Sequence, residues 1–365
     1  MVMEAQLNVA ADIKVRFLEK SARYYLNRST ILFGASNSGK STILLEILYL
    51  LRGDVPNIFV FAPTAEANNA FDGIVPAPLI YKTVDIEILT EIYNRQQGAT
   101  KIYNTVNNLG ALRELFKRVA GQSEMAAAEM ADRNALEIMA RKEGDAALGY
   151  AERRATIAEV KEVRDDYLKK LYKCVIRAGK KRLRNMELGD TEKYILKYLD
   201  FNPNCVIVLD DCGAILKRFQ KEEVVKKIIF QGRHSYINII LTLQDDLHLD
   251  SSIKKNSFVN IFTTSQCAAA YFNRGSNSFG KKERERAEKI VNFIFTASSV
   301  KKDFKKLVYL RDEVDPFRYT VADVYDGFRF GCPSLWRLCN RVTKNKKVCD
   351  FVNDPLLMSF KIDGL

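Results

Sequence analysis

Eight consecutive residues carry the clearest chemical pattern of the sequence. Residues 34–41 read Gly-Ala-Ser-Asn-Ser-Gly-Lys-Ser and fit G-x-x-x-x-G-K-[ST], the pattern of loops that bind nucleotide phosphates. Gly34 and Gly39 allow a tight turn in which successive backbone N–H groups point at phosphate oxygens. We predict that Lys40 brings a positive charge to the β- and γ-phosphates of ATP, and that the Ser41 hydroxyl binds Mg²⁺.

The segments on either side of this loop are those that the motif requires. Residues 29–33 are a short apolar run with high strand propensity, and residues 42–51 are rich in leucine and isoleucine and predict a helix. The amino end of that helix adds the positive end of its dipole to the phosphate site. A chance glycine turn with an incidental lysine would not explain both neighbours. The predicted nucleotide-binding residues are Gly34, Ala35, Ser36, Asn37, Ser38, Gly39, Lys40, Ser41 and Thr42.

Two acidic residues follow another apolar run. Residues 205–209 are apolar throughout and are followed by Asp210 and Asp211. In a parallel sheet the carboxyl ends of the strands open onto the ligand crevice. We therefore predict that Asp210 holds Mg²⁺ and that Asp211 activates or orients the water that attacks the γ-phosphate. Two adjacent acids can also form a solvated turn, but the strongly apolar run before them favours the catalytic interpretation.

A glutamine and an arginine flank the next apolar run. Gln244 follows residues 237–243, where its amide could sense the γ-phosphate or position the attacking water; the alternative is a strand-end amide in solvent. Arg233 lies at the end of the helix predicted for residues 221–234. From there it would have to reach across the sheet to the phosphates of a nucleotide bound by its own chain. We predict that it acts on a neighbouring subunit's nucleotide as an arginine finger. The alternative for Arg233 is a surface cation at a helix carboxyl end.

The charge balance favours a polyanionic partner. The 365 residues include 57 Lys and Arg against 45 Asp and Glu, a net charge of +12, for which nucleic acid is the commonest partner. A basic but uncommitted surface is the alternative. Cations that contact DNA phosphates without reading bases are expected in the last hundred residues. The candidates are Lys281, Lys282, Arg284, Lys301, Lys302, Lys305 and Lys306, although interleaved glutamates make a solvated helix an equal alternative for the first three.

The order of these elements predicts the fold class. The strand, loop and helix around residues 29–51 and a second apolar run at 57–63 form a βαβ unit, so the fold is α/β with a central, mostly parallel sheet flanked by helices. Residues 109–189 lack proline and are rich in Ala, Glu, Lys and Arg, which predicts a helical insertion. The expected domains are a discontinuous core of residues 1–108 and 190–330, the insertion, and a carboxyl-terminal extension of residues 331–365. Spacing in residues 10–25 also predicts a helix.

The cysteines and the hydropathy pattern bear on metal binding and on the cellular compartment. Seven cysteines without a Cys-x-x-Cys spacing and two histidines argue against a zinc site. An odd cysteine count without a secretory signal suggests a reducing compartment. No apolar stretch approaches the length of a membrane span, so we expect a soluble, intracellular protein.

Three of these segments together resemble a known family. GASNSGKS (34–41), CVIVLDDCG (205–213) and GRHSYINIILTLQD (232–245), in this order, resemble the FtsK–HerA superfamily of DNA-pumping ATPases. Within it they are most similar to the poxvirus-type genome-packaging ATPases of nucleo-cytoplasmic large DNA viruses. The most specific segment is the Gly-Arg-His start followed by an apolar strand that ends in Gln. The resemblance covers residues 30–63 and 202–264, and the helical insertion departs from the compact family pattern.

The resemblance implies a RecA-like core in a homo-oligomeric ring, pentameric or hexameric, with double-stranded DNA in its channel. It implies ATP and Mg²⁺ as cofactors, Lys40, Ser41, Asp210 and Asp211 in phosphate, Mg²⁺ and water activation, Gln244 as sensor, and a trans role for Arg233. The implied function is an ATP-hydrolysing motor that packages a viral genome, with capsid or portal proteins as partners, in the viral factory of the host cytoplasm and in the virion. The open alternatives are a cellular or plasmid HerA-like translocase, a nucleotide kinase, and a nucleotide-gated DNA-binding scaffold.

Overall fold

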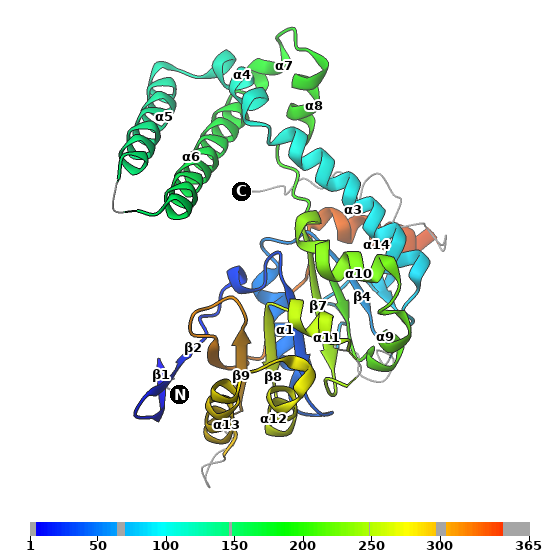
Figure 1. Cartoon of the computed structure of the whole chain (residues 1–365). Coiled ribbons are helices and arrows are strands. Elements are labelled where there is room, and N and C mark those ends of the chain that lie inside the picture. Colours follow the sequence, from blue (N-terminus) through cyan, green and yellow to red (C-terminus); the bar gives the residue numbers. More distant parts are fainter. Residues whose placement is uncertain (1–4, 64–69, 146–147, 248, 297–303, 346–365) are drawn as a thin grey trace. The chain divides into compact units, whose positions relative to one another are not determined.

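The computed structural model describes residues 5–63, 70–145, 148–247, 249–296 and 304–345. Contacts divide the chain into two compact units (Figure 1). The first comprises residues 1–99 and 202–365, and the second residues 100–201. Helix α3 (Ile86–Val106) begins in the first unit and ends in the second.

The first unit is built on one sheet, to which ten strands of the described residues belong. From one edge to the other the strands are β1 (Gln6–Ala10), β2 (Ile13–Phe17), β10 (Phe317–Val321), β9 (Lys305–Leu310), β8 (Val259–Phe262), β3 (Ser29–Phe33), β7 (Ile237–Leu243), β6 (Cys205–Leu209), β4 (Asn57–Phe61) and β5 (Ile80–Tyr81). The six strands from β8 to β5 pair in parallel, whereas β9 is antiparallel to both β8 and β10.

The central strands are buried on both faces. Every residue of β3, β4, β6, β7 and β8 is buried, as expected for parallel strands that helices cover on either side. The helices of this unit are α1 (Lys40–Leu51), α9 (Gly213–Phe219), α10 (Glu223–Gln231), α11 (Ser251–Asn256), α12 (Ser265–Asn273), α13 (Lys281–Phe295) and α14 (Pro333–Asn345), with short 3-10 turns η1 (Ala22–Tyr24), η2 (Ala77–Leu79), η3 (Gly232–Ser235) and η4 (Gly275–Asn277). The predicted α/β fold with a central, mostly parallel sheet flanked by helices and with a helical insertion is confirmed.

The register brings four strand ends together. Phe33 of β3 pairs with Leu243 of β7 on one side and with Phe262 of β8 on the other, and Leu209 of β6 pairs with Leu241. Because these strands are parallel, their carboxyl ends lie along one side of the sheet. We call this line of strand ends the carboxyl edge of the sheet, and the opposite line of strand starts its amino edge. The segments that follow them, including the glycine loop and the acidic pair, therefore begin side by side.

The prediction of a helix over residues 10–25 is wrong. Residues 13–17 form strand β2, and their burial alternates, with Ile13 and Val15 buried and Lys14 and Arg16 exposed. This alternation has the period of a strand that is covered on one face. The only helical turn described in this segment is η1.

The second unit is helical. It contains α4 (Leu109–Val119), α5 (Gln122–Glu143), α6 (Tyr150–Ala178), α7 (Lys180–Arg184) and α8 (Asp190–Tyr198). Its apolar core is formed by Val106, Leu112, Leu115, Phe116, Ala128, Leu168, Tyr172, Ile176, Leu183, Leu188, Ile195, Leu196 and Leu199. The unit extends beyond residues 109–189 at both ends, because Val106 of α3 and Ile195 and Leu196 of α8 contribute to this core.

Two further expectations concern the carboxyl-terminal extension and membrane-spanning helices. Of the expected extension 331–365, the structure describes residues up to 345, and there Leu335, Leu338 and Cys339 of α14 pack into the core of the first unit. No described helix is long and apolar enough to cross a membrane.

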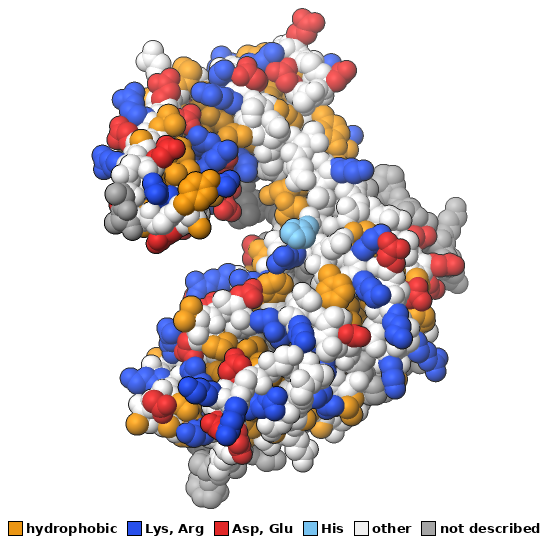
Figure 2. Space-filling model, in the orientation of Figure 1, with side chains coloured by type: hydrophobic (Ala, Val, Ile, Leu, Met, Phe, Trp, Pro, Cys, Tyr) orange, Lys and Arg blue, Asp and Glu red, His pale blue; other side chains and the backbone are white. Residues whose placement is uncertain are grey.

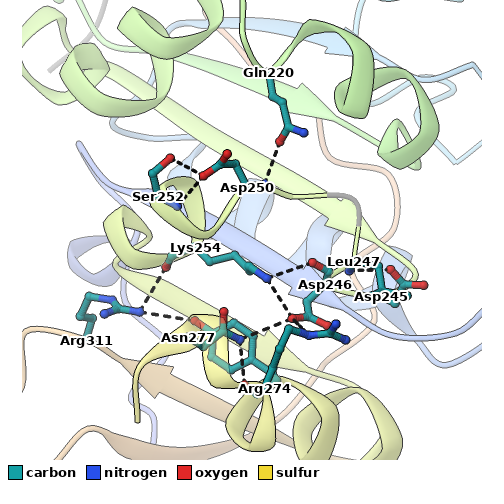
Figure 3. A network of polar contacts seen from close by, with 11 residues as sticks. Gln220, Asp245, Asp246, Leu247, Asp250, Ser252, Lys254, Arg274, Asn277 and Arg311 are labelled. Atoms are coloured by element: carbon teal, nitrogen blue, oxygen red, sulfur yellow. Dashed lines mark hydrogen bonds and ion pairs between the residues drawn. The ribbon is translucent and has the colours of Figure 1, made fainter.

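A buried ionic network holds the segment after β7 (Figure 3). The Asp246 carboxylate, 3% exposed, lies 3.1 Å from Lys254 Nζ and 2.8 Å from Arg274 Nε. Asn277 Nδ2 donates to the same carboxylate at 3.4 Å, and Arg311 Nη2 donates to the Lys254 carbonyl at 3.2 Å. The loop that begins at Gln244 is thereby joined to α11 and to the turn after α12.

Removing the anion of this network should destabilise the first unit strongly. We expect Asp246→Ala to lower the free energy of unfolding by about 3–5 kcal/mol, because Lys254 (3% exposed) would remain buried without its carboxylate. Urea denaturation measures the change as a lower midpoint. The double variant Asp246→Ala/Lys254→Met should be more stable than Asp246→Ala alone. Asp312→Ala, on an exposed loop, is the control; equal losses in both single variants would contradict the assignment.

Candidate nucleotide site

The glycine loop forms one turn between β3 and α1. Helix α1 begins at Lys40, so residues 34–39 lie at its amino end. Asn37 and Gly39 have φ angles of 58° and 87°, both in the left-handed region, which glycine adopts without steric cost at position 39. Ser38 N–H donates to the Ala35 carbonyl at 3.3 Å and closes the turn.

A close approach explains the first glycine. A Cβ atom on Gly34 would lie 1.7 Å from Thr263 Oγ1 and 2.6 Å from Ser38 Oγ. Thr263 is buried directly after β8; its Oγ1 lies 2.5 Å from Ser38 Oγ and donates to the Phe33 carbonyl at 3.2 Å. Thr263 therefore supports the loop from the neighbouring strand. Nothing in the sequence around Thr263 predicts this role, because a threonine at a strand end carries no motif.

The Lys40 ammonium lies on the carbonyl side of the loop. Its Nζ donates to the Ala35 carbonyl at 2.8 Å and also to the Gly34 carbonyl. Burial lowers the pKa of Lys40, while the carboxylates of Asp211 and Asp210 act in the opposite direction. The structure thus brings the predicted phosphate lysine and the predicted acidic pair into one electrostatic environment.

A threonine joins the two acids. Thr242 Oγ1 donates to Asp210 Oδ1 at 2.5 Å and accepts the Asp211 N–H at 2.9 Å. Burial raises the pKa of Asp210 and the Thr242 hydrogen bond opposes that rise; Asp211 raises the pKa further and Lys40 lowers it. Asp211 has a φ of 50°, so the chain turns sharply between the two carboxylates. The sequence signal for Thr242 is a single hydroxyl inside a strand that is buried throughout.

Gln244 lies beside Asp211, as the predicted roles require. Its Nε2 is 3.3 Å from Asp211 Oδ1 and 3.5 Å from Oδ2, and its side chain is exposed. Cys267 Sγ donates to the Gln244 carbonyl at 3.2 Å. An exposed amide beside the half-buried carboxylate of Asp211 leaves that pair able to hold a water molecule at the sheet edge.

The oxygen donors assigned to Mg²⁺ fit that ion. Ser41 lies in the first turn of α1, and Asp210 follows β6 at the same sheet edge. Mg²⁺ is bound by one or two protein oxygens together with substrate phosphates and waters, so a hydroxyl and a carboxylate beside a phosphate loop suffice. The Thr242 hydrogen bond would orient the Asp210 carboxylate, which is the usual role of a residue behind a metal ligand.

Arg233 lies at the amino edge of the sheet, where the parallel strands begin. It is in η3, before the amino end of β7, whereas Gln244 follows the carboxyl end of this seven-residue strand. At roughly 3.3 Å per residue, about 20 Å of strand separates the two positions. Arg233 is exposed, and its guanidinium lies 5.5 Å from the centre of the Phe258 ring, which the Arg28 guanidinium also approaches at 5.9 Å. The structure therefore does not bring Arg233 to the glycine loop (the P-loop, residues 34–41) of its own chain.

The predicted DNA contacts divide into separate environments. Lys281 and Lys282 are exposed at the start of α13, and Arg284 Nε donates to the Phe279 carbonyl at 2.9 Å. Lys305 is half-buried at the start of β9. Lys301 and Lys302 lie outside the described residues. On the face drawn in Figure 2, Lys and Arg side chains are interspersed with acidic and apolar ones, so no continuous basic path stands out there.

Lys306 requires a correction. It is 6% exposed, and its Nζ donates to the Ser38 carbonyl of the glycine loop at 2.8 Å. Burial lowers the pKa of this lysine. A side chain enclosed beside the loop cannot contact a DNA backbone, so we remove Lys306 from the predicted DNA-binding residues.

No protein-family model matches the chain. Its sequence is 28% identical over 362 residues to the uncharacterized protein B354L of African swine fever virus isolates from Kenya and Namibia. These alignments cover 95% of this chain and 96% of each relative.

Similar solved structures include nucleotide-dependent proteins of several kinds. The DNA-packaging ATPase B204 from Sulfolobus Turreted Icosahedral Virus has a TM-score of 0.36 at 10% identity, with 81% of this chain and 97% of that chain covered. The plasmid coupling protein TrwB has a TM-score of 0.37 at 13% identity, with 87% and 92% covered. The type VII secretion ATPase EccC of Thermomonospora curvata scores 0.33 at 14% identity; 82% of this chain matches 26% of that one. Because these TM-scores are low, we base the functional proposal on the residues of the site.

The hydroxyl between the two acids should matter for metal-dependent binding. We expect Thr242→Val to weaken Mg²⁺-dependent binding of a fluorescent ATP analogue roughly 10- to 100-fold, because Asp210 loses a hydrogen bond to a charged group. Binding in excess EDTA should change much less, and Thr242→Ser, which keeps the hydroxyl, should stay close to the wild type. Equal losses with and without Mg²⁺ would show that Thr242 acts on the loop rather than on the metal ligand.

Proposed function

We propose that the chain is a Mg²⁺-dependent ATPase that couples hydrolysis to the movement of double-stranded DNA. The observation that carries the ATPase proposal is the meeting of Lys40, the Thr242-linked acids and Gln244 at one sheet edge. Phosphoryl transfer needs a cation for the phosphates, an oxygen ligand for Mg²⁺, and a group that orients the attacking water. Each is present there within a few residues of a strand end.

Each residue of the site has a proposed role that follows from its contacts. Lys40 would exchange the loop carbonyls for the β- and γ-phosphate oxygens, to which the loop N–H groups and the amino end of α1 also point. Mg²⁺, held by Ser41 and Asp210, would neutralise phosphate charge. Asp211 accepts a hydrogen bond from the Gln244 amide, and it would also accept one from the attacking water and hold that water in line.

The DNA-translocating part of the proposal rests on charge and on Arg233. The net charge of +12 favours a polyanion, and Lys281, Lys282, Arg284 and Lys305 remain as proposed DNA contacts. Arg233 is too far from its own P-loop to act in cis, which favours a homo-oligomeric ring of five or six subunits in which it serves the neighbour. The related African swine fever virus protein favours a viral setting. Genome packaging in the infected cell's cytoplasm, with capsid or portal proteins as partners, is the specific form that we propose.

Hydrolysis with and without duplex DNA tests this function. We expect the wild type to hydrolyse ATP, duplex DNA to stimulate the rate, and Lys40→Ala to reduce it at least about 100-fold, since one charged phosphate contact is worth several kcal/mol in a closed site. Phosphate release gives the rate, and Lys14→Ala, an exposed lysine of β2, is the control. Phosphate transfer to a nucleoside would indicate a kinase, binding without turnover a nucleotide-gated scaffold, and turnover indifferent to DNA would contradict a motor.

Mixing two inactive variants tests the trans role of Arg233. An Arg233→Ala subunit keeps its P-loop, and a Lys40→Ala subunit keeps its arginine, so neighbouring copies should restore a fraction of the interfaces. We expect the 1:1 mixture to hydrolyse ATP faster than either variant alone. Mass photometry establishes that the mixture assembles as the wild type does. An absence of rescue at every ratio, with assembly intact, would refute the trans role.

A further inference from the structure

Lys306 reaches the glycine loop from a strand that the sequence motifs do not include. Its strand, β9, is antiparallel to β8, so the amino end of β9 lies at the same sheet edge as the carboxyl ends of β8 and β3. The Lys306 ammonium donates to the Ser38 carbonyl at 2.8 Å. It also lies 3.3 Å from where a Cβ atom on Gly39 would stand, directly before the first residue of α1.

The charge of this lysine is not balanced by an acid of the described chain. Two other lysines of the same unit, the buried Lys254 and the half-buried Lys20, pair with carboxylates: Lys254 with Asp246 at 3.1 Å, and Lys20 with Glu46 at 2.7 Å. Lys306 is 6% exposed, and no described acidic side chain forms an ion pair with it. A buried cation is unfavourable unless it is paired. The position therefore suits an anion that is not part of the chain.

Lys40 and Lys306 form the same kind of contact with the glycine loop. Each ammonium donates to backbone carbonyls of the loop, Lys40 to those of Gly34 and Ala35 and Lys306 to that of Ser38. Burial lowers the pKa of both lysines, but only Lys40 also has Asp210 and Asp211 to oppose that effect. Lys40, at the start of α1, and Lys306, on β9, thus contact the two ends of the glycine loop.

We propose that Lys306 is a second nucleotide-binding cation, which neutralises the phosphates of a nucleoside di- or triphosphate in the loop from the Ser38–Gly39 end. The proposal rests on the nucleotide binding proposed above and adds a ligand-contacting residue to it. A lysine that merely braced the loop would affect every ligand of the loop alike. A phosphate cation affects ligands in proportion to the phosphate charge that they bring.

Two substitutions separate charge from bracing. Lys306→Met keeps the aliphatic stem without the charge, and Lys306→Gln keeps a donor for the Ser38 carbonyl without the charge. Calorimetric titration of the full chain with ATP, ADP and AMP gives the affinities. We expect both variants to bind ATP and ADP roughly 10- to 100-fold more weakly, as for loss of a hydrogen bond to a charged group, with AMP affected less than about threefold. Lys306→Arg should recover part of the ATP affinity.

The ligand-free stability gives an independent readout. Because Met replaces an unpaired buried charge with an apolar chain, the midpoint of thermal unfolding of Lys306→Met without nucleotide should equal or exceed that of the wild type. The increase in that midpoint on adding ATP should shrink. Lys14→Met, on the exposed face of β2, is the matched control and should change neither.

The results that overturn the inference are distinct from those that overturn the proposed function. Unchanged ATP affinity in Lys306→Met, equal losses for ATP and AMP, or full affinity in Lys306→Gln would each refute a charge role for Lys306. Should Lys306→Met not fold, Lys306→Gln alone must show the phosphate-dependent loss. A wild type that binds no nucleotide would refute the proposed function itself, whereas a wild type that binds ATP through Lys40 while Lys306 is silent would refute only the inference.

Discussion

The burial of the central strands on both faces is the constraint on which the site depends. β3, β6 and β7 expose none of their residues, so a polar side chain within them is unfavourable unless it is hydrogen-bonded inside the sheet. Polar groups that are to meet a ligand must therefore stand where the strands end. The parallel register then aligns Gly34, Asp210, Gln244 and Thr263, which come from segments far apart in the chain, at one edge. The chemistry is concentrated there because the core excludes it elsewhere.

Thr242 is an exception that follows from the same constraint. It is fully buried in β7, and it satisfies its hydroxyl by donating to Asp210 and accepting from the Asp211 backbone. These two hydrogen bonds of the Thr242 hydroxyl fix Asp210 and Asp211, which follow β6, relative to β7. Since Gln244 follows Thr242 by two residues and touches Asp211, β7 fixes both sides of the proposed water site. The Asp246 network then anchors the chain just beyond Gln244, so that the exposed amide stands between two buried attachments.

The sequence predicts the parts of the site that local patterns encode. The glycine loop, the strand before it and the acids after an apolar run are local, and the structure has each at the predicted residues. Thr263 and Lys306 reach the loop only through strand pairing, so nothing in their own segments distinguishes them from a strand-end threonine or a surface lysine. Lys306 belongs to a run of lysines that resembles a solvated basic surface, and for this reason the sequence predicts a DNA contact there. The spacing of Ile13 and Phe17 fits a helix, but the buried Val15 between them shows the period of a strand.

The opposite edge of the sheet gives the strongest physical reason to consider a multimer. Arg28 and Arg233 precede β3 and β7, and both guanidiniums lie on the Phe258 ring, at 5.9 and 5.5 Å. Together with Ile228, Ile237 and Asn256 they line one pocket. No described acidic side chain forms an ion pair with either arginine, and two like charges on one ring repel unless an anion lies between them. The P-loop of the same chain cannot supply that anion, because the length of β7 separates the two edges. Under the proposed trans role of Arg233, a phosphate bound by a second copy of the chain would supply that anion.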